Sequence, residues 1–118
     1  MLPFQVFSSI TMSGTTQVIS SVSTIKYVDN VSIGLQWLGT PQGTFDVQGS
    51  VDYNEGTPQS GGGADSGTWT TFTTTTVGSG TNHLLYDLNQ LSFPFIRTVY
   101  TNSTASGVLN GHIAGKSV

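Results

Sequence analysis

The chain has 118 residues, a net charge of −3 and a charged fraction of 8%, against about 25% in ordinary soluble domains. Its three basic residues, Lys26, Arg97 and Lys116, are too few and too widely spaced for the phosphate-neutralising patch that nucleic-acid binding requires. No segment approaches the roughly 18 consecutive apolar residues of a membrane span. We therefore expect neither a nucleic-acid partner nor a membrane partner.

Length and the absence of cysteine predict one domain over residues 1–118 that folds without disulfides. Thr, Ser, Asn, Gln and Gly fill the polar positions, which gives a neutral surface with little repulsion between copies. Such a surface fits a protein that packs beside copies of itself or onto a scaffold, and equally an extracellular β-domain. The N-terminus lacks the charged and apolar regions of a secretory signal.

In chain order, the first predicted element lies within residues 1–12, which we expect to form an N-terminal arm or a first strand. Phe4, Val6 and Ile10 share one parity, so this pattern places them on the inner face. Residues 17–27 alternate less regularly and predict one bent strand or two short ones.

The clearest strand signal covers residues 31–37, where apolar and polar side chains alternate and Trp37 is the last inward residue. Residues 45–52 repeat the alternation, with Phe45, Val47 and Val51 facing inward. Gly39-Thr40-Pro41-Gln42-Gly43 between the two segments has the composition of a turn. We therefore predict an antiparallel hairpin with a five-residue connection.

Residues 54–67 form the longest interruption and are rich in Gly, Ser and Pro, so we expect an exposed, mobile loop. The Thr-rich segment 69–77 follows. It has strand propensity with little apolar content, which indicates an exposed or edge strand.

Three more segments complete the chain. Residues 82–88 alternate, and residues 107–115 place Leu109 and Ile113 inward. Residues 93–100 are apolar on both parities, which is typical of a central strand or of one with a bulge. The total is about eight strands without helical periodicity. We predict an all-β fold, an antiparallel two-sheet β-sandwich that is jelly-roll-like.

The sequence offers no catalytic constellation. His83 and His112 are the only histidines, and neither stands in a nucleophile motif. Asp46 and Asp52 share the outward face of one predicted strand, which is a generic arrangement for a carboxylate pair. We therefore expect no enzymatic activity.

We also expect no metal and no cofactor. The oxygen ligands around the loop, Asp52, Asn54, Glu55 and Asp65, do not have the spacing of an EF-hand and are read as solvated acids.

Two further groups of residues are candidates for binding. Tyr53 and Trp69 flank the long loop and are candidate platforms for stacking on a sugar ring, as is Tyr100, although a core role is the simpler interpretation of each. Arg97 is the only arginine and lies in an apolar segment. A structural ion pair, with Asp87 as the suggested partner, is one account of Arg97, and an interface contact is the other.

From about residue 31 onward, the chain resembles the small β-sandwich virion proteins of tailed bacteriophages. The segments that carry this likeness are Gly34-Leu35-Gln36-Trp37, Gly43-Thr44-Phe45-Asp46-Val47-Gln48-Gly49-Ser50, Gly67-Thr68-Trp69-Thr70, Tyr86-Asp87-Leu88-Asn89-Gln90-Leu91, Phe95-Ile96-Arg97, Val99-Tyr100-Thr101, Gly107-Val108-Leu109 and Ile113-Ala114-Gly115-Lys116. These motifs form a sandwich and carry over no catalytic residue.

The resemblance implies a many-copy component of a phage particle, made in the host cytoplasm and located in the virion. The expected role is a capsid decoration or cement protein, and the alternatives are a tail, neck or fibre component and a jelly-roll carbohydrate-binding module that takes a glycan. The implied partners are the major capsid protein or other virion proteins, and further copies in a homo-oligomer. We expect the assembly contacts in Leu2, Pro3 and Phe4, in loop 54–67, and in Tyr53 and Trp69.

Overall fold

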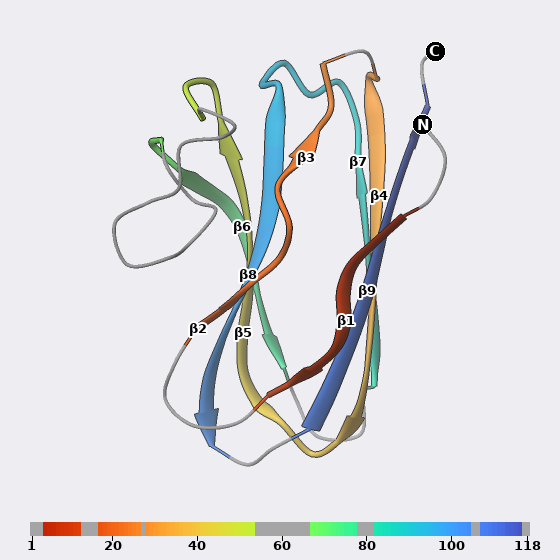
Figure 1. The fold of residues 1–118 in the computed structure, drawn as a ribbon, viewed down its shortest axis with the longest axis vertical. Coiled ribbons are helices and arrows are strands. Elements are labelled where there is room, and N and C mark those ends of the chain that lie inside the picture. The colour runs from red at the N-terminus through yellow and green to blue at the C-terminus, as the bar shows by residue number, and fades with distance from the viewer. Residues whose placement is uncertain are drawn as a thin grey trace.

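The computed structural model describes residues 4–12, 17–26, 28–53, 67–77, 82–104 and 107–116, with the side chains of residues 103 and 104 left out. These residues form nine strands and no helix (Figure 1). The strands are β1 (Phe4–Thr11), β2 (Gln17–Ile19), β3 (Ser23–Thr24), β4 (Asn30–Gly39), β5 (Gln42–Ser50), β6 (Thr70–Val77), β7 (His83–Leu88), β8 (Phe95–Thr104) and β9 (Gly107–Lys116).

The strands form two antiparallel sheets that face each other across the core (Figure 1). The first sheet has the order β1-β9-β4-β7, and the second has the order β2-β8-β5-β6 with β3 also paired to β8. If β2 and β3 are counted as one broken strand, as the irregular pattern of residues 17–27 allowed, the two orders become 1-8-3-6 and 2-7-4-5. This is the strand order of a jelly roll, so the predicted two-sheet sandwich is confirmed.

The predicted hairpin between residues 31–37 and 45–52 is wrong. β4 pairs with β7 and β9, whereas β5 pairs with β6 and β8. Thr40 and Pro41 therefore carry the chain from one sheet to the other instead of folding it back within one sheet. The sequence pattern is the same in both cases, because alternation reports which side chains face the core and not which strand is the neighbour.

Side-chain alternation builds the core as predicted for most strands. The largest aromatic group in this core consists of three buried residues, Trp37, Phe45 and Tyr100. The centroid of the Phe45 ring lies 5.5 Å from that of Trp37 and 4.9 Å from that of Tyr100. The Tyr100 hydroxyl lies 2.8 Å from Asn102 Oδ1 and 3.1 Å from the Gln42 carbonyl. Burial raises the pKa of Tyr100, so the hydroxyl remains a proton donor.

The prediction for the first strand is correct in part. Val6 is buried, but register shifts between Gln5 and Phe7 and between Phe7 and Ile10 change the parity of β1. As a result Phe7 is buried and Phe4 is 41% exposed. Bulges of this kind follow from pairing with β9 and leave no clear signature in a short sequence.

Candidate functional site

An aromatic cluster covers part of the outer face of the second sheet. Phe95 and Arg97 alternate along β8 with the inward residues Ile96 and Thr98, so their side chains point away from the core. The Tyr53 ring lies 5.2 Å from Phe95 and 5.6 Å from Trp69, and the Arg97 guanidinium lies 4.3 Å above the Trp69 ring. The structure therefore brings Tyr53 and Trp69 together, and both are half-buried. We call these four residues the outer aromatic cluster.

The structure corrects the suggested partner of Arg97. Arg97 Nε donates a hydrogen bond of 2.8 Å to Gln48 Oε1. Asp87 lies on β7 in the other sheet, where the Ser32 hydroxyl donates to it. The guanidinium also covers one face of the Trp69 indole. Tyr100, a third candidate for sugar stacking, is fully buried in the core.

A local network joins the chain segments on either side of residues 54–66. The Asp52 carboxylate accepts hydrogen bonds from the Thr68 backbone N–H at 2.7 Å and from the Ser50 hydroxyl at 2.9 Å. Gly67 has a φ of 106°, and a Cβ there would lie 2.8 Å from the Tyr53 Cα, so this position requires glycine. The hydrogen bond from the Thr68 backbone, followed by that from Ser50, lowers the pKa of Asp52. The carboxylate is therefore a fixed negative charge at neutral pH.

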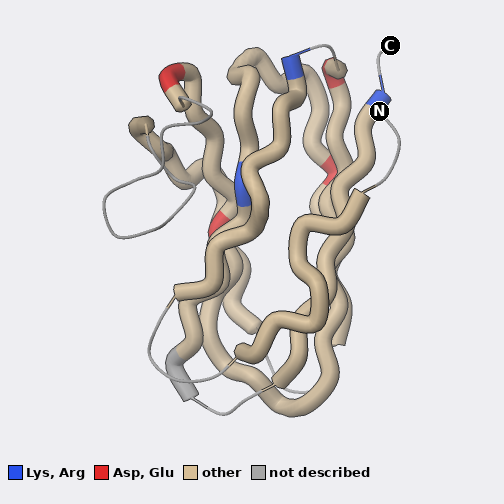
Figure 2. Tube along the Cα trace, viewed as in Figure 1, with Lys and Arg blue, Asp and Glu red and all other residues tan. Residues whose placement is uncertain are grey.

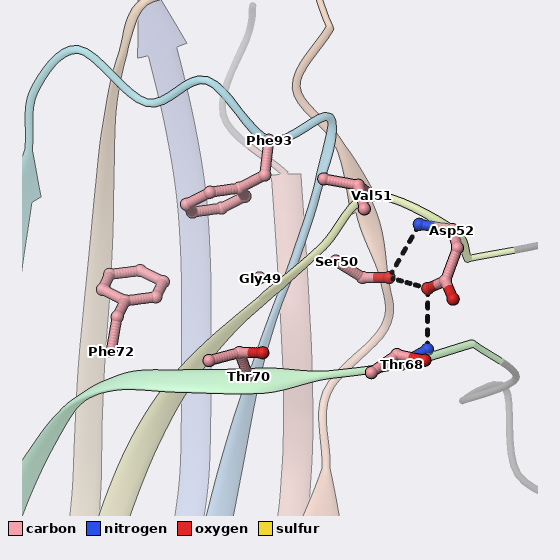
Figure 3. Close-up of a pocket in the computed structure, with 8 residues that line it drawn as sticks. All are labelled: Gly49, Ser50, Val51, Asp52, Thr68, Thr70, Phe72 and Phe93. Carbon is pink, nitrogen blue, oxygen red and sulfur yellow. Dashed lines mark hydrogen bonds between the residues drawn. The ribbon is translucent and has the colours of Figure 1, made fainter.

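A cleft of about 290 Å³ opens beside this network (Figure 3). Figure 3 shows the Phe72 and Phe93 rings together at one end, where their centroids are 5.3 Å apart, and Ser50, Asp52 and Thr68 at the other. Gly49 lies between the two ends, and a Cβ on it would lie 2.7 Å from the Phe93 ring. Val51, which the alternation of residues 45–52 predicts to face inward, is instead 76% exposed and lines the cleft, because β5 ends at Ser50 and Val51 lies beyond it. The cleft is therefore apolar over most of its length and anionic at one end.

No pattern in the sequence indicates this cleft. Phe72 comes from β6, Gly49 from β5 and Phe93 from the segment before β8, and only the tertiary structure brings them together. The one signal was Phe72 itself, an aromatic residue that interrupts a run of threonines.

The remaining predicted contact residues are only partly described. Phe4 is half-exposed at the start of β1. Leu2, Pro3 and residues 54–66 lie outside the described residues, and so do the acids Glu55 and Asp65.

Among the residues that the structure describes, none with a charged side chain lies at the end of the sandwich opposite Asp52, which we call the Leu38 end. Thr11, Gly39 and Gly107 meet there, with Gly39 paired to Gly107 and the Met12 N–H bonded to the Gly107 carbonyl. Figure 2 shows every charged residue of the described chain in the upper half of the view, away from this end. Leu38 is 72% exposed, and Val108, its partner on β9, is 37% exposed.

The sequences that follow the strands β1, β4, β6 and β8 are likewise without charge. Residues 12–16, 40–41, 78–82 and 105–106 contain no Asp, Glu, Lys or Arg. The described part of the Leu38 end thus has two exposed apolar side chains, and the sequences between the neighbouring strands contain no charged residue.

Comparison with known proteins supports the fold. No protein-family model matches the chain, and no curated protein matches it in sequence. Among solved structures, the SPBc2 prophage-derived protein YomS is similar with a TM-score of 0.50, 13% identity and coverage of 96% of this chain and 95% of the other. The Yersinia pseudotuberculosis-derived mitogen YPM is similar with a TM-score of 0.53, 12% identity and coverage of 98% and 87%.

A third similar structure is CBM29_1, a family 29 carbohydrate-binding module from Piromyces equi, with a TM-score of 0.47, 11% identity and coverage of 98% and 91%. At identities this low, the likeness to YomS and YPM shows a shared β-sandwich fold and nothing finer.

Proposed function

We propose that this chain is a non-enzymatic structural protein of a bacteriophage virion, and specifically a capsid decoration protein that binds the major capsid protein on the head surface. In this role it is made in the host cytoplasm and works as a many-copy component of the virion. The weak binding of one small β-sandwich is then summed over a lattice and over the copies of a homo-oligomer.

The observation that carries this proposal is the Leu38 end. An exposed leucine and valine, surrounded by sequence without charge, favour contact with another apolar surface and do not repel a neighbouring copy. The whole chain has only nine charged residues, three basic and six acidic. A protein that must remain dispersed at high concentration usually has more charge.

The similarity in fold to YomS supports the phage context of this proposal. YomS is described as a prophage-derived protein, and its sandwich aligns with nearly the whole of this chain. The phage context is therefore consistent with the resemblance seen in the sequence from residue 31 onward.

The test is to add purified protein to phage heads assembled without it and to image the particles by electron cryomicroscopy. Regular added density at symmetric positions of the shell supports decoration. Density only at the portal vertex or tail supports the alternative role as a tail, neck or fibre component. If no part of the particle carries added density, the proposed role in the virion is contradicted.

A pair of variants tests which surface binds. Leu38→Lys places a charge on the Leu38 end, and Leu85→Lys places the same charge on β7, at a leucine that is 67% exposed. Both side chains are largely in solvent, so each substitution should change the free energy of unfolding by less than about 0.5 kcal/mol. We expect Leu38→Lys to abolish added density and Leu85→Lys to retain it.

A second candidate function, glycan binding, rests on the outer aromatic cluster. Tyr53 and Trp69 lie side by side and half-exposed, as a sugar-stacking surface requires. A glycan array probed with the isolated protein tests this function, with Trp69→Ala as the informative variant and Phe72→Ala as an aromatic control outside the cluster. Retention of a glycan signal in Trp69→Ala would exclude the cluster as the binding site.

A further inference from the structure

The edge of β6 differs from the other outer strands of the sandwich. β1 has two register shifts and a residue at positive φ, Ser9. β2 and β3 have three and two residues, and β7 contains Asp87. Short length, bulges and charge are the features by which proteins prevent an edge strand from pairing with another chain.

β6 has few of these features. It has eight residues without charge, proline or glycine, and it ends the second sheet, so no described strand pairs with its far side. A register shift occurs near Phe72, but Thr73–Val77 pair with Gly43–Val47 in unbroken register. This regular segment presents backbone donors and acceptors to any extended chain that approaches it.

The cleft lies directly beside this edge. Thr70 and Phe72 belong to β6 and line the cleft, and Thr70 pairs with Gly49 in its floor. Because paired residues of neighbouring strands point to the same face, a residue opposite Thr70 on an added strand would direct its side chain into the cleft. Backbone pairing and a pocket for alternate side chains together define recognition by strand addition.

We propose that the β6 edge and the Phe72–Phe93 cleft form one site that binds an extended segment of a partner protein by strand addition. The segment supplies a large apolar or aromatic side chain to the cleft. A lysine or arginine two positions from that side chain, and therefore on the same face of the added strand, meets the Asp52 carboxylate, which is held in place by Ser50 and Thr68. The proposal does not depend on the virion role, because it concerns a different surface from the Leu38 end.

The experiment is to select a random dodecapeptide library displayed on yeast against the full chain and to measure the binding of synthetic peptides from the selection. We expect peptides of β-forming residues with one large apolar residue and a Lys or Arg two positions from it, because residues i and i+2 of a strand share a face. N-methylation of every second backbone amide should abolish binding in one set and leave it in the other, because only alternate amides face the neighbouring strand.

Two variants with the same substitution test the cleft. Thr70→Trp fills it, whereas Thr76→Trp adds the same ring on β6 at an exposed position opposite Thr44, outside the cleft lining. Both substitutions are at exposed threonines, so both variants should fold. We expect Thr70→Trp to weaken peptide binding by at least ~10-fold and Thr76→Trp to leave it within ~2-fold. Asp52→Asn should weaken only peptides with the basic residue.

Several outcomes would overturn the proposal. They are a selection without enriched peptides, binding that tolerates both sets of N-methylation, and equal effects of the two tryptophan variants. A dimer that Thr76→Lys dissociates and Leu85→Lys does not would also overturn it, because a second copy would then occupy the edge. Failure of these tests leaves binding to phage heads through the Leu38 end unaffected, so the two proposals fail separately.

Discussion

Two clusters of three aromatic rings each, among the residues that the structure describes, occupy opposite environments. Trp37, Phe45 and Tyr100 lie between the sheets and are almost wholly buried. Tyr53, Trp69 and Phe95 lie on the outer face of the second sheet, where the first two are half-exposed. The difference arises from strand parity, since inward positions of β4, β5 and β8 supply the first cluster and the outer one includes the outward residue Phe95.

The inner cluster contributes to the stability of the fold, whereas the outer cluster contributes to the shape of the surface. The inner cluster removes large apolar areas from water and links both sheets. In the outer cluster, the Trp69 ring instead stacks on Arg97, and the network of Asp52 and Gly67 positions the cluster beside the cleft. We therefore expect the inner cluster to determine folding and the outer one to determine what the Asp52 end of the sandwich can bind.

The largest expected effect is the difference between Phe45→Ala and Trp69→Ala. Phe45 is fully buried between two rings, so its removal should lower the free energy of unfolding by about 3–5 kcal/mol. Trp69 is half-exposed, and its removal should cost only about 1 kcal/mol, mainly the contact with Arg97. Denaturant unfolding of both variants measures the difference. Similar losses would show that the outer cluster is part of the stabilising core.

A glycine pair tests the packing beneath the cleft. A Cβ at Gly49 would lie 2.7 Å from the Phe93 ring, so Gly49→Ala should cost about 1–3 kcal/mol as the ring is displaced. Gly34 has no atom within 4 Å of the corresponding position, so Gly34→Ala should be neutral or stabilising by up to about 1 kcal/mol. Thermal unfolding compares the two variants. If Gly49→Ala leaves the stability unchanged, the Phe93 ring is not held against this backbone, and the cleft has a different shape from the one described above.

The smallest expected effect is the pH dependence supplied by Asp52. Its folded-state pKa lies below the ordinary value of 3.8, so its contribution to stability is complete above that value and is lost as the pH falls through the folded-state pKa. Asp52→Asn should therefore be less stable than the parent protein at pH 6, and the difference should shrink below pH ~4.

Denaturant unfolding at several pH values measures this difference, with Asp87→Asn as a control at an exposed aspartate that accepts from Ser32. If the difference in the free energy of unfolding between Asp52→Asn and the parent protein stays constant with pH, the Asp52 network does not depend on the charged carboxylate.

Much of the fold was predictable from local patterns. The alternation of residues 31–37 and 107–115 and the edge character of the Thr-rich segment agree with the structure, and of the two alternatives for residues 17–27, one bent strand or two short ones, the structure has two short strands. The bulges of β1 were not predictable, because they depend on the register with β9. Tyr53 and Trp69 stood out because they flank a conspicuous loop, and their role in contacts stays a prediction, whereas the cleft was missed because its residues are distant in sequence.

The sequence by itself determined the class of fold, the inward residues of most strands and the neutral character of the surface. These properties follow from composition and from a period of two, which each segment expresses locally. Only the tertiary structure decided that β4 and β5 belong to different sheets, that Arg97 stacks on Trp69 and that Phe72, Phe93 and Gly49 form one cleft. The physical reason is that strand pairing is a long-range choice. Alternation fixes which face of a strand is buried, while the neighbour of that strand depends on the packing of the whole chain.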